Sequence, residues 1–222
     1  MLLNRIPPIL GAVLLLSVSI RAADRASAPT PPPATAPAKA VIVEDFESYA
    51  DDQHLAKTWY KPPHGGAVHQ TRETTIKNSG NYSLKVEYTT TASNDRFYSP
   101  ICRVSRWNLA GCNALQFWFK PDGSGRALLV DLNIATPEGK NIHDLWDFKY
   151  LPEKGDTAPR LVTVPFSKLV KNDKYADSPN TSPVFKPEAL IEVALCIGGR
   201  NDEPGAGVYY FDDFRGVSVL HD

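Results

Sequence analysis

The sequence predicts an all-β protein with a β-sandwich architecture. The chain of 222 residues contains 19 Pro and 14 Gly, and short runs of β-branched and aromatic residues lie between these turn formers. Such a pattern is typical of many short strands. Long stretches with helical periodicity are absent from the sequence. With 42% hydrophobic residues, the chain can bury one sizeable core, and its length does not require a second folded domain.

The stretch 113–133 predicts a β-hairpin at the centre of this fold. Two alternating runs flank the turn formers PDGSG at 121–125, which supply the backbone conformations that a hairpin loop needs. The face expected in the core carries Leu115, Phe117, Phe119, Leu128, Val130 and Leu132. The opposite face, with Gln116, Trp118, Leu129, Asp131 and Asn133, suits either a sugar-binding surface or the solvated side of an antiparallel sheet.

Further strands are predicted at 41–46, 141–150, 161–166, 191–197 and 207–214, with a turn followed by a strand at 79–88 and a helical turn at 167–170. Two segments leave alternatives open. Trp146, Phe148 and Tyr150 alternate with polar residues, so this row is either exposed for sugar stacking, with Asp144 or Asp147 as hydroxyl acceptors, or buried in the core. Trp59 and Tyr60 are either lids over the core or exposed platforms.

The N-terminal residues predict export. In residues 1–22, Arg5 precedes an apolar run at 9–20 that is too short to span a bilayer comfortably, and Ala22 follows, which is typical of a secretory signal peptide. Residues 23–40 are rich in Pro, Ala and Thr and predict a disordered linker. The folded domain is therefore expected at 41–222, in a secreted or periplasmic protein.

Charge and cysteine content restrict the partners. The net charge of −1 is spread without a long basic run, so nucleic acid and anionic membranes are not expected as partners. Of the three cysteines, Cys102 and Cys112 are close enough in sequence for a local disulfide, whereas Cys196 lies in an apolar run and is expected to be a free thiol. No His joins them at metal-ligand spacing, so zinc is not expected.

Several motifs occur in an order that resembles a known family. They are EDFESY (44–49), SGNYSLKVEY (79–88), NALQFWFKPDGSG (113–125), VTVPFSKL (162–169), IGG (197–199) and GVYYFDDF (207–214). The chain resembles galactose-binding-like jelly rolls, and most closely carbohydrate-binding module family 11, over residues 41–217. Domains of the complex I intermediate-associated protein 30 type are similar at the same level.

The resemblance implies two sites. The first is a structural Ca²⁺ ion held by Glu47 of the DFE motif, by Asp212 or Asp213 of the FDD motif, and by backbone carbonyls of residues 77–80. The second is a cleft on one sheet whose ligand-binding residues correspond to Tyr60, Tyr88, Asp131, Trp146 and Tyr175.

The expected function is that of a monomeric, non-catalytic domain that binds a β-glucan-like polysaccharide. No catalytic residues are predicted, because acidic residues are too common to identify a glycosidase pair and no lyase, Gly-x-Ser-x-Gly, Walker or His-Glu-x-x-His motif is present. The first alternative is a protein-interaction or assembly-factor domain of the complex I intermediate-associated protein 30 type. The second is a jelly-roll polysaccharide lyase or glycoside hydrolase.

Overall fold

The computed structural model describes residues 40–93, 96–135, 144–172, 182–199 and 203–219. All of these residues belong to a unit that spans 36–222. The predicted signal peptide and all but the last residue of the predicted linker lie outside the described residues. The first strand, β1 (Val41–Glu44), begins at the residue where the folded domain was expected to begin.

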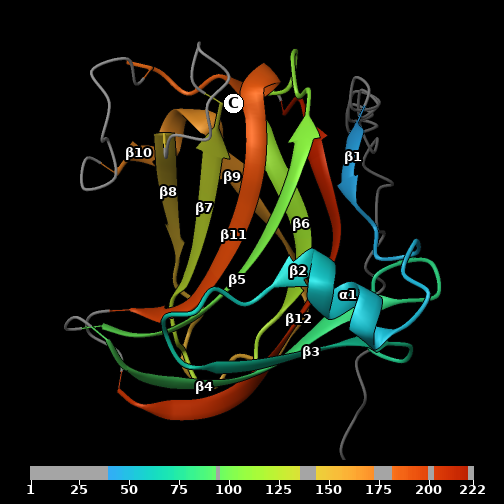
Figure 1. The fold of residues 1–222 in the computed structure, drawn as a ribbon, viewed down its shortest axis with the longest axis vertical. Coiled ribbons are helices and arrows are strands. Elements are labelled where there is room, and N and C mark those ends of the chain that lie inside the picture. Colours follow the sequence, from blue (N-terminus) through green and yellow to red (C-terminus); the bar gives the residue numbers. More distant parts are fainter. Residues whose placement is uncertain (1–39, 94–95, 136–143, 173–181, 200–202, 220–222) are drawn as a thin grey trace, which may run out of the picture. The chain divides into compact units, whose positions relative to one another are not determined.

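Antiparallel strands build two layers, which we call sheet A and sheet B (Figure 1). Sheet A has the order β3 (Ala67–Glu73), β4 (Ser83–Ser93), β12 (Gly205–Val217), β6 (Ala114–Lys120) and β9 (Arg160–Pro165), and β1 also pairs with β12. Sheet B has the order β10 (Val170–Lys171), β8 (Asp144–Tyr150), β7 (Leu128–Ile134), β11 (Leu190–Gly199), β5 (Arg96–Trp107) and β2 (Trp59–Tyr60). The end of β4 pairs with the start of β5 and joins the two sheets. The predicted all-β sandwich is confirmed.

The core lies between the sheets and contains the side chains that alternation predicted. All six predicted core residues of 113–133 are fully buried. The strand predicted at 191–197 contributes Val193, Leu195 and Ile197. Burial of this kind is stabilising because it removes apolar area from water at about 25 cal/mol per Å². Phe117 and Phe214 stack within this core, with their ring centroids 4.8 Å apart.

The hairpin prediction for 113–133 is wrong. β6 pairs with β9 and β12 in sheet A, whereas β7 pairs with β8 and β11 in sheet B. Residues 121–127 therefore cross from one sheet to the other, and Asp122 holds this corner by accepting hydrogen bonds from Tyr88 Oη (2.6 Å) and Val208 N (3.0 Å). Alternation fits both arrangements, because a strand buries every second side chain in either one. Trp118 and Asp131 consequently lie on the outer faces of different sheets.

The helical elements are short and lie at the edges of the sheets. α1 (Asp52–Thr58) was not predicted; its N-cap residue Asp51 accepts a hydrogen bond from His54 N at 2.7 Å, and Leu55 is its buried anchor. Figure 1 shows α1 beside β2 and β3. The 3₁₀ helix η1 (Phe166–Lys168) overlaps the helical turn predicted at 167–170, and η3 (Pro187–Ala189) precedes β11. In the described part of the chain, no helix is long and apolar enough to cross a membrane.

Candidate functional site

A row of directly opposed residues crosses the outer face of sheet B. In the register of the strands, Tyr60 of β2 is opposite Cys102 of β5, which is opposite Ala194 of β11. Ala194 is opposite Asp131 of β7, which is opposite Asp147 of β8. Because opposed residues on neighbouring strands point to the same face, these five side chains share one surface.

This surface is hollowed into a cleft of about 580 Å³. The two middle strands, β5 and β11, line the cleft with small residues, namely Cys102, Ala194, Cys196 and Gly198. Larger side chains such as Tyr60 of β2 and Lys149 of β8 lie on the strands at either side. The small residues leave the space that an extended ligand would fill. The rest of the lining consists of Tyr60, Pro62, Pro63, His64, Pro100, Leu129, Asp131, Leu145, Asp147, Lys149, Asn172, Glu192 and Gly199.

The two aromatic residues of β2 point in opposite directions. Trp59 is buried in the core, and its indole Nε1 donates a hydrogen bond to Glu44 at 3.1 Å. Tyr60 is 39% exposed and lines the cleft. Each of the two alternatives for this segment therefore holds for one of its aromatic residues. Partial burial is the main cause that raises the pKa of Tyr60 to about 12, and the neighbouring Cys102 and Glu192 are smaller causes, so the Tyr60 hydroxyl stays protonated and can donate.

Asp131 lies in the cleft as predicted, directly opposite Asp147. Asp131 Oδ2 accepts a hydrogen bond from the Cys196 thiol at 3.3 Å, and Asp147 Oδ2 accepts one from Asn172 Nδ2 at 2.8 Å. Burial first, and then the charge of Asp147, raise the pKa of Asp131 to about 8. Asp144, the other predicted hydroxyl acceptor on this strand, is buried and accepts a hydrogen bond from Ser182 N at 2.7 Å.

Sequence reasoning missed several cleft residues, among them Lys149, Glu192 and His64. For Lys149 and Glu192, the alternation of side chains along their strands could have indicated a position in the cleft. Lys149 is two positions from Asp147 on β8, and Glu192 is two positions from Ala194 on β11. Using that signal required knowledge of which face of each strand is outward. His64 follows the Pro62–Pro63 pair in a loop, where alternation gives no information.

The assignment of Tyr88 to the ligand surface is wrong. Tyr88 is 3% exposed and belongs to the core, together with Leu84 and Val86 of the same strand. Its hydroxyl donates to Asp122, and its ring lies 5.2 Å from that of Tyr209. Tyr88 is in phase with Leu84 and Val86 along β4, and all three side chains are buried.

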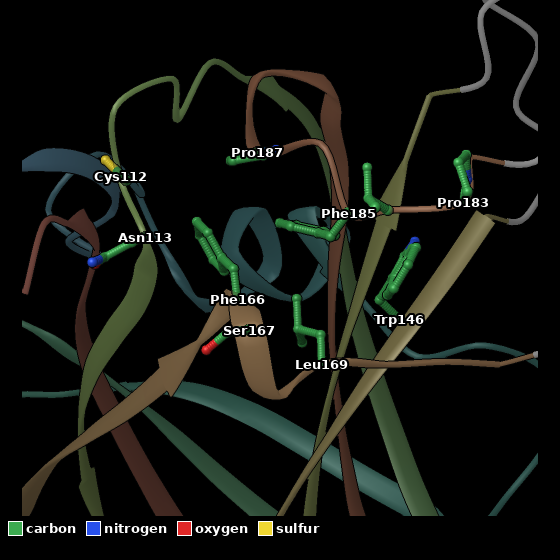
Figure 2. Close-up of a pocket in the computed structure, with 10 residues that line it drawn as sticks. Cys112, Asn113, Trp146, Phe166, Ser167, Leu169, Pro183, Phe185 and Pro187 are labelled. Atoms are coloured by element: carbon green, nitrogen blue, oxygen red, sulfur yellow. The ribbon is translucent and has the colours of Figure 1, made fainter. Parts of the chain in front are cut away.

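The assignment of Trp146 to the cleft is also wrong. Trp146 is 7% exposed and is opposite Leu132, a core residue of β7, so the row of Trp146, Phe148 and Tyr150 faces inward and Asp147 faces the cleft. Figure 2 shows Trp146, Phe166 and Phe185 around a second, largely apolar pocket of about 440 Å³. Tyr175, the remaining predicted platform, lies outside the described residues.

Glu47 and Asp212 contact the same turn, residues 78–82. Glu47 accepts hydrogen bonds from the backbone N–H groups of Asn81 (2.7 Å) and Tyr82 (2.9 Å). Asp212 accepts from Asn78 N at 2.8 Å and Ser79 N at 3.1 Å. We call this arrangement of Glu47, Asp212, Asp213 and residues 78–82 the clasp. It ties the end of the first strand and the last strand to one loop.

The donor chemistry of the clasp is compatible with a hard cation. A carboxylate offers about four acceptor positions, and the hydrogen bonds of Glu47 and of Asp212 occupy three on each. Burial raises the pKa of Asp212 to about 6 despite these donors, so its charge is only partly compensated. Within the described ranges, no group of three or more His, Cys, Asp or Glu side chains could hold a metal ion. A cation here would therefore depend on two carboxylates and on backbone oxygens.

The three cysteines are free thiols, so the suggested Cys102–Cys112 bridge is not formed. Cys102 lies within β5 and faces the cleft. Cys112 lies in the turn before β6, near Gly216 of β12. Their closeness in sequence did not bring them together, because β5 continues to Trp107 and carries the chain away from Cys102. Cys196 is free, as expected.

A β-sandwich with a polar cleft on one face and a tyrosine at the edge of that cleft is the arrangement expected of a carbohydrate-binding domain. The family model described as carbohydrate binding domain (family 11) matches residues 28–193. The chain belongs to this family, whose members are non-catalytic binding modules. The match begins within the predicted linker. No curated protein sequence matches the chain.

Solved structures of family 11 modules share the fold. One is a module from Clostridium thermocellum in complex with a β-1,3-1,4-mixed-linked tetrasaccharide, which is 15% identical with a TM-score of 0.62 over 82% of this chain and 98% of the other. Another is the module of the cellulase Lic26A-Cel5E of the same organism, at 13% identity and a TM-score of 0.61 over 83% and 97% of the two chains. Identities this low establish the fold and leave the ligand to be argued from the site.

Proposed function

We propose that the domain binds a β-glucan-like polysaccharide in the cleft of sheet B and catalyses no reaction on it. The observation that carries this proposal is the row from Tyr60 to Asp147, which combines an exposed ring with carboxyl groups on one hollow surface. The row crosses four strand spacings, or about 19 Å at about 4.8 Å each. That length suits an oligosaccharide segment better than one monosaccharide. The related module that was solved with a mixed-linked tetrasaccharide supports the choice of a glucan.

The two ends of the row have different tasks in this proposal. The ring of Tyr60 offers an apolar face on which the C–H groups of a pyranose can stack. Asp131 and Asp147 offer oxygens that hold sugar hydroxyls and so fix the register of the chain. The small residues between them let the sugar rings approach the sheet.

The spacing of the two carboxyl groups supports binding without catalysis. Glycosidases keep their two carboxyl groups about 5 to 9.5 Å apart on either side of the reacting sugar. Asp131 and Asp147 are directly opposite each other on neighbouring strands, where Cβ atoms lie about 4.5 to 5.5 Å apart, so no sugar ring fits between them. Both groups therefore contact a ligand from the same side.

The proposal extends to the setting of the domain. Residues 1–22 would direct export and residues 23–40 would serve as a spacer, so the domain would act outside the cytoplasm as a monomer. A Ca²⁺ ion at the clasp would be held by Glu47, Asp212 and backbone oxygens and would stabilise the fold. The acceptor positions that remain on both carboxylates support this assignment.

Affinity gel electrophoresis with mixed-linked β-1,3-1,4-glucan tests the proposal. The protein is expected to be retarded in the glucan gel, Tyr60→Ala is expected to migrate nearly as it does without glucan, and no new reducing ends should appear. Equal migration of the unmodified protein with and without a panel of β-glucans would contradict the binding function. Release of reducing ends would contradict its non-catalytic character.

A further inference from the structure

We propose that Asp131 and Asp147 share a single proton and act as one donor–acceptor pair, so that glycan binding weakens when the pair loses this proton. This inference rests on the proposed function, because it concerns the regulation of the same cleft. It adds a pH dependence that neither the family nor the fold implies.

The geometry of Asp131 requires a proton or a ligand donor. Its Oδ1 is buried and receives no hydrogen bond from the residues that the structure describes. From the same described residues, its Oδ2 accepts one hydrogen bond, which comes from the Cys196 thiol, a weak donor. Two charged carboxylates cannot be close neighbours in a buried site at low cost, so one of them retains a proton.

The groups that face Asp131 from the neighbouring strands do not relieve this charge. Glu192 of β11 adds a third carboxyl group, and Cys196 of β11 and Cys102 of β5 are neutral thiols, since burial raises the pKa of both. Lys149 lies two positions from Asp147 on β8. In the described part of the chain, no Lys or Arg forms an ion pair with Asp131.

The remaining titratable groups of the lining are Tyr60 and His64, which lie in the segment on the β2 side of the cleft. Burial, followed by the charge of Asp147, raises the pKa of Asp131 to about 8, which agrees with a retained proton.

The shared proton suits a neutral sugar. A carboxylic acid beside a carboxylate presents one O–H donor and several acceptor oxygens on the same surface. Neighbouring hydroxyl groups of a glycan need both kinds of partner. After the proton is lost, the pair has no donor and carries two like charges that a sugar would have to desolvate.

Isothermal titration with a mixed-linked β-glucan tetrasaccharide at several pH values tests the proposal. If only the protonated pair binds, the apparent affinity follows the protonated fraction and falls about tenfold between pH 7 and pH 9. Circular dichroism at each pH verifies that the protein remains folded. Constant affinity between pH 7 and pH 9 would overturn the proposal.

The variant Asp147→Asn isolates the pair. Its amide supplies a donor that does not titrate, so its affinity is expected to be equal at pH 7 and pH 9. Two matched controls are Glu192→Gln and His64→Asn. Each can bind the tetrasaccharide more or less tightly than the unmodified protein, but its affinity should still fall about tenfold between pH 7 and pH 9. A tenfold fall that persists in Asp147→Asn would assign the pH dependence to another group and overturn the proposal.

Carbon-13 NMR of the aspartate carboxyl groups tests the shared proton without any glycan. The expected result is a titration near pH 8 that involves both Asp131 and Asp147 and disappears in Asp147→Asn. Titration of both groups below pH 5 would overturn the shared proton even if glycan binds. The protein could also titrate near pH 8 and yet bind no glucan at any pH. That result would establish the proton shared by Asp131 and Asp147, but it would contradict both the proposed function and the role of the pair in binding.

Discussion

Two pairs of aspartates in this protein have opposite surroundings. Asp212 and Asp213 in the clasp are buried, and hydrogen-bond donors surround them: Asp212 accepts from three backbone N–H groups and Asp213 from Asn78, Ser79 and Arg215. In the cleft, one carboxyl oxygen of Asp131 accepts a hydrogen bond from the Cys196 thiol, and the other oxygen accepts none from the described residues. The chain itself supplies several donors to each member of the first pair, whereas one buried oxygen of Asp131 is left for a proton or a ligand donor.

The backbone reflects the same difference. Asp213 has a positive φ of 52°, and the pairing of β12 with β6 shifts register between Asp212 and Arg215. This bulge turns the carboxyl groups toward the 78–82 turn, a conformation that non-glycine residues rarely adopt. Asp131 and Asp147 lie in regular pairing. The number of donors around a carboxylate, rather than the density of acidic residues, thus separates a structural group from one directed at a ligand.

The largest expected effect is at the clasp. Asp212→Ala leaves two N–H groups of the turn without their acceptor and should lower the free energy of unfolding by about 3 kcal/mol. Urea denaturation in the presence of EDTA measures this without a contribution from metal. Glu47→Gln, which keeps an acceptor oxygen, is the milder control. A change below about 0.5 kcal/mol for Asp212→Ala, the usual range for surface sites, would show that the clasp is not structural.

Loss of the exposed ring in the cleft should change affinity and not stability. Tyr60→Ala removes the exposed ring and is expected to weaken β-glucan binding about tenfold, or about 1.4 kcal/mol, with an unchanged melting temperature. Trp146→Ala removes a ring from the inner face of the same sheet and should instead lower the melting temperature while the folded fraction keeps its affinity. The reverse result for the two variants would mean that the faces of sheet B are assigned incorrectly.

The two pairs should also differ in the pH dependence of stability. Because the pKa of Asp131 is raised to about 8, stability is lost as the pH rises from the ordinary carboxyl range to about 8. Asp131→Asn should therefore be more stable than the unmodified protein at pH 8.5 and gain nothing at pH 4.

Asp213 is the control for this pH dependence. Burial alone would raise its pKa, but hydrogen bonds from Asn78, Arg215 and Ser79 outweigh burial and lower the pKa of Asp213. Asp213→Asn should accordingly lose stability at neutral pH and lose little at low pH. Thermal melts at pH 4 and pH 8.5 measure both variants. Equal shifts at the two pH values would contradict the charge states assigned here.

The smallest expected effect is that of calcium. Saturation of a site at the clasp should raise the melting temperature by about 2 to 4 °C, which corresponds to about 1 kcal/mol for a domain of this size. EDTA should reverse the shift, and Glu47→Gln should reduce it. Melting curves that superimpose with Ca²⁺ and with EDTA, together with no metal in elemental analysis, would show that hydrogen bonds alone complete the clasp.

The sequence by itself determined which residues are buried along each strand. Alternation is a local property, so Leu115, Phe117, Val130 and Leu132 could be placed in the core before any pairing was known. Tyr88 is in phase with Leu84 and Val86 on its strand, and this phase, rather than the ligand-binding role expected of Tyr88, agrees with its burial. The resemblance also implied that the first and last strands meet, and β1 does pair with β12, whereas the cation assigned to Glu47 and Asp212 stays a prediction.

Only the tertiary structure decided which sheet each strand joins and which residues meet across strands. Residues 121–127 suit a hairpin turn and a crossing between sheets equally well, so β6 and β7 could not be separated from sequence. The face of β8 was likewise undetermined, since Trp146 and Asp147 exchange places when the register moves by one residue. The pairing of Asp131 with Asp147 depends on that register, because it joins residues whose distance in the sequence conveys nothing about their contact in the sheet.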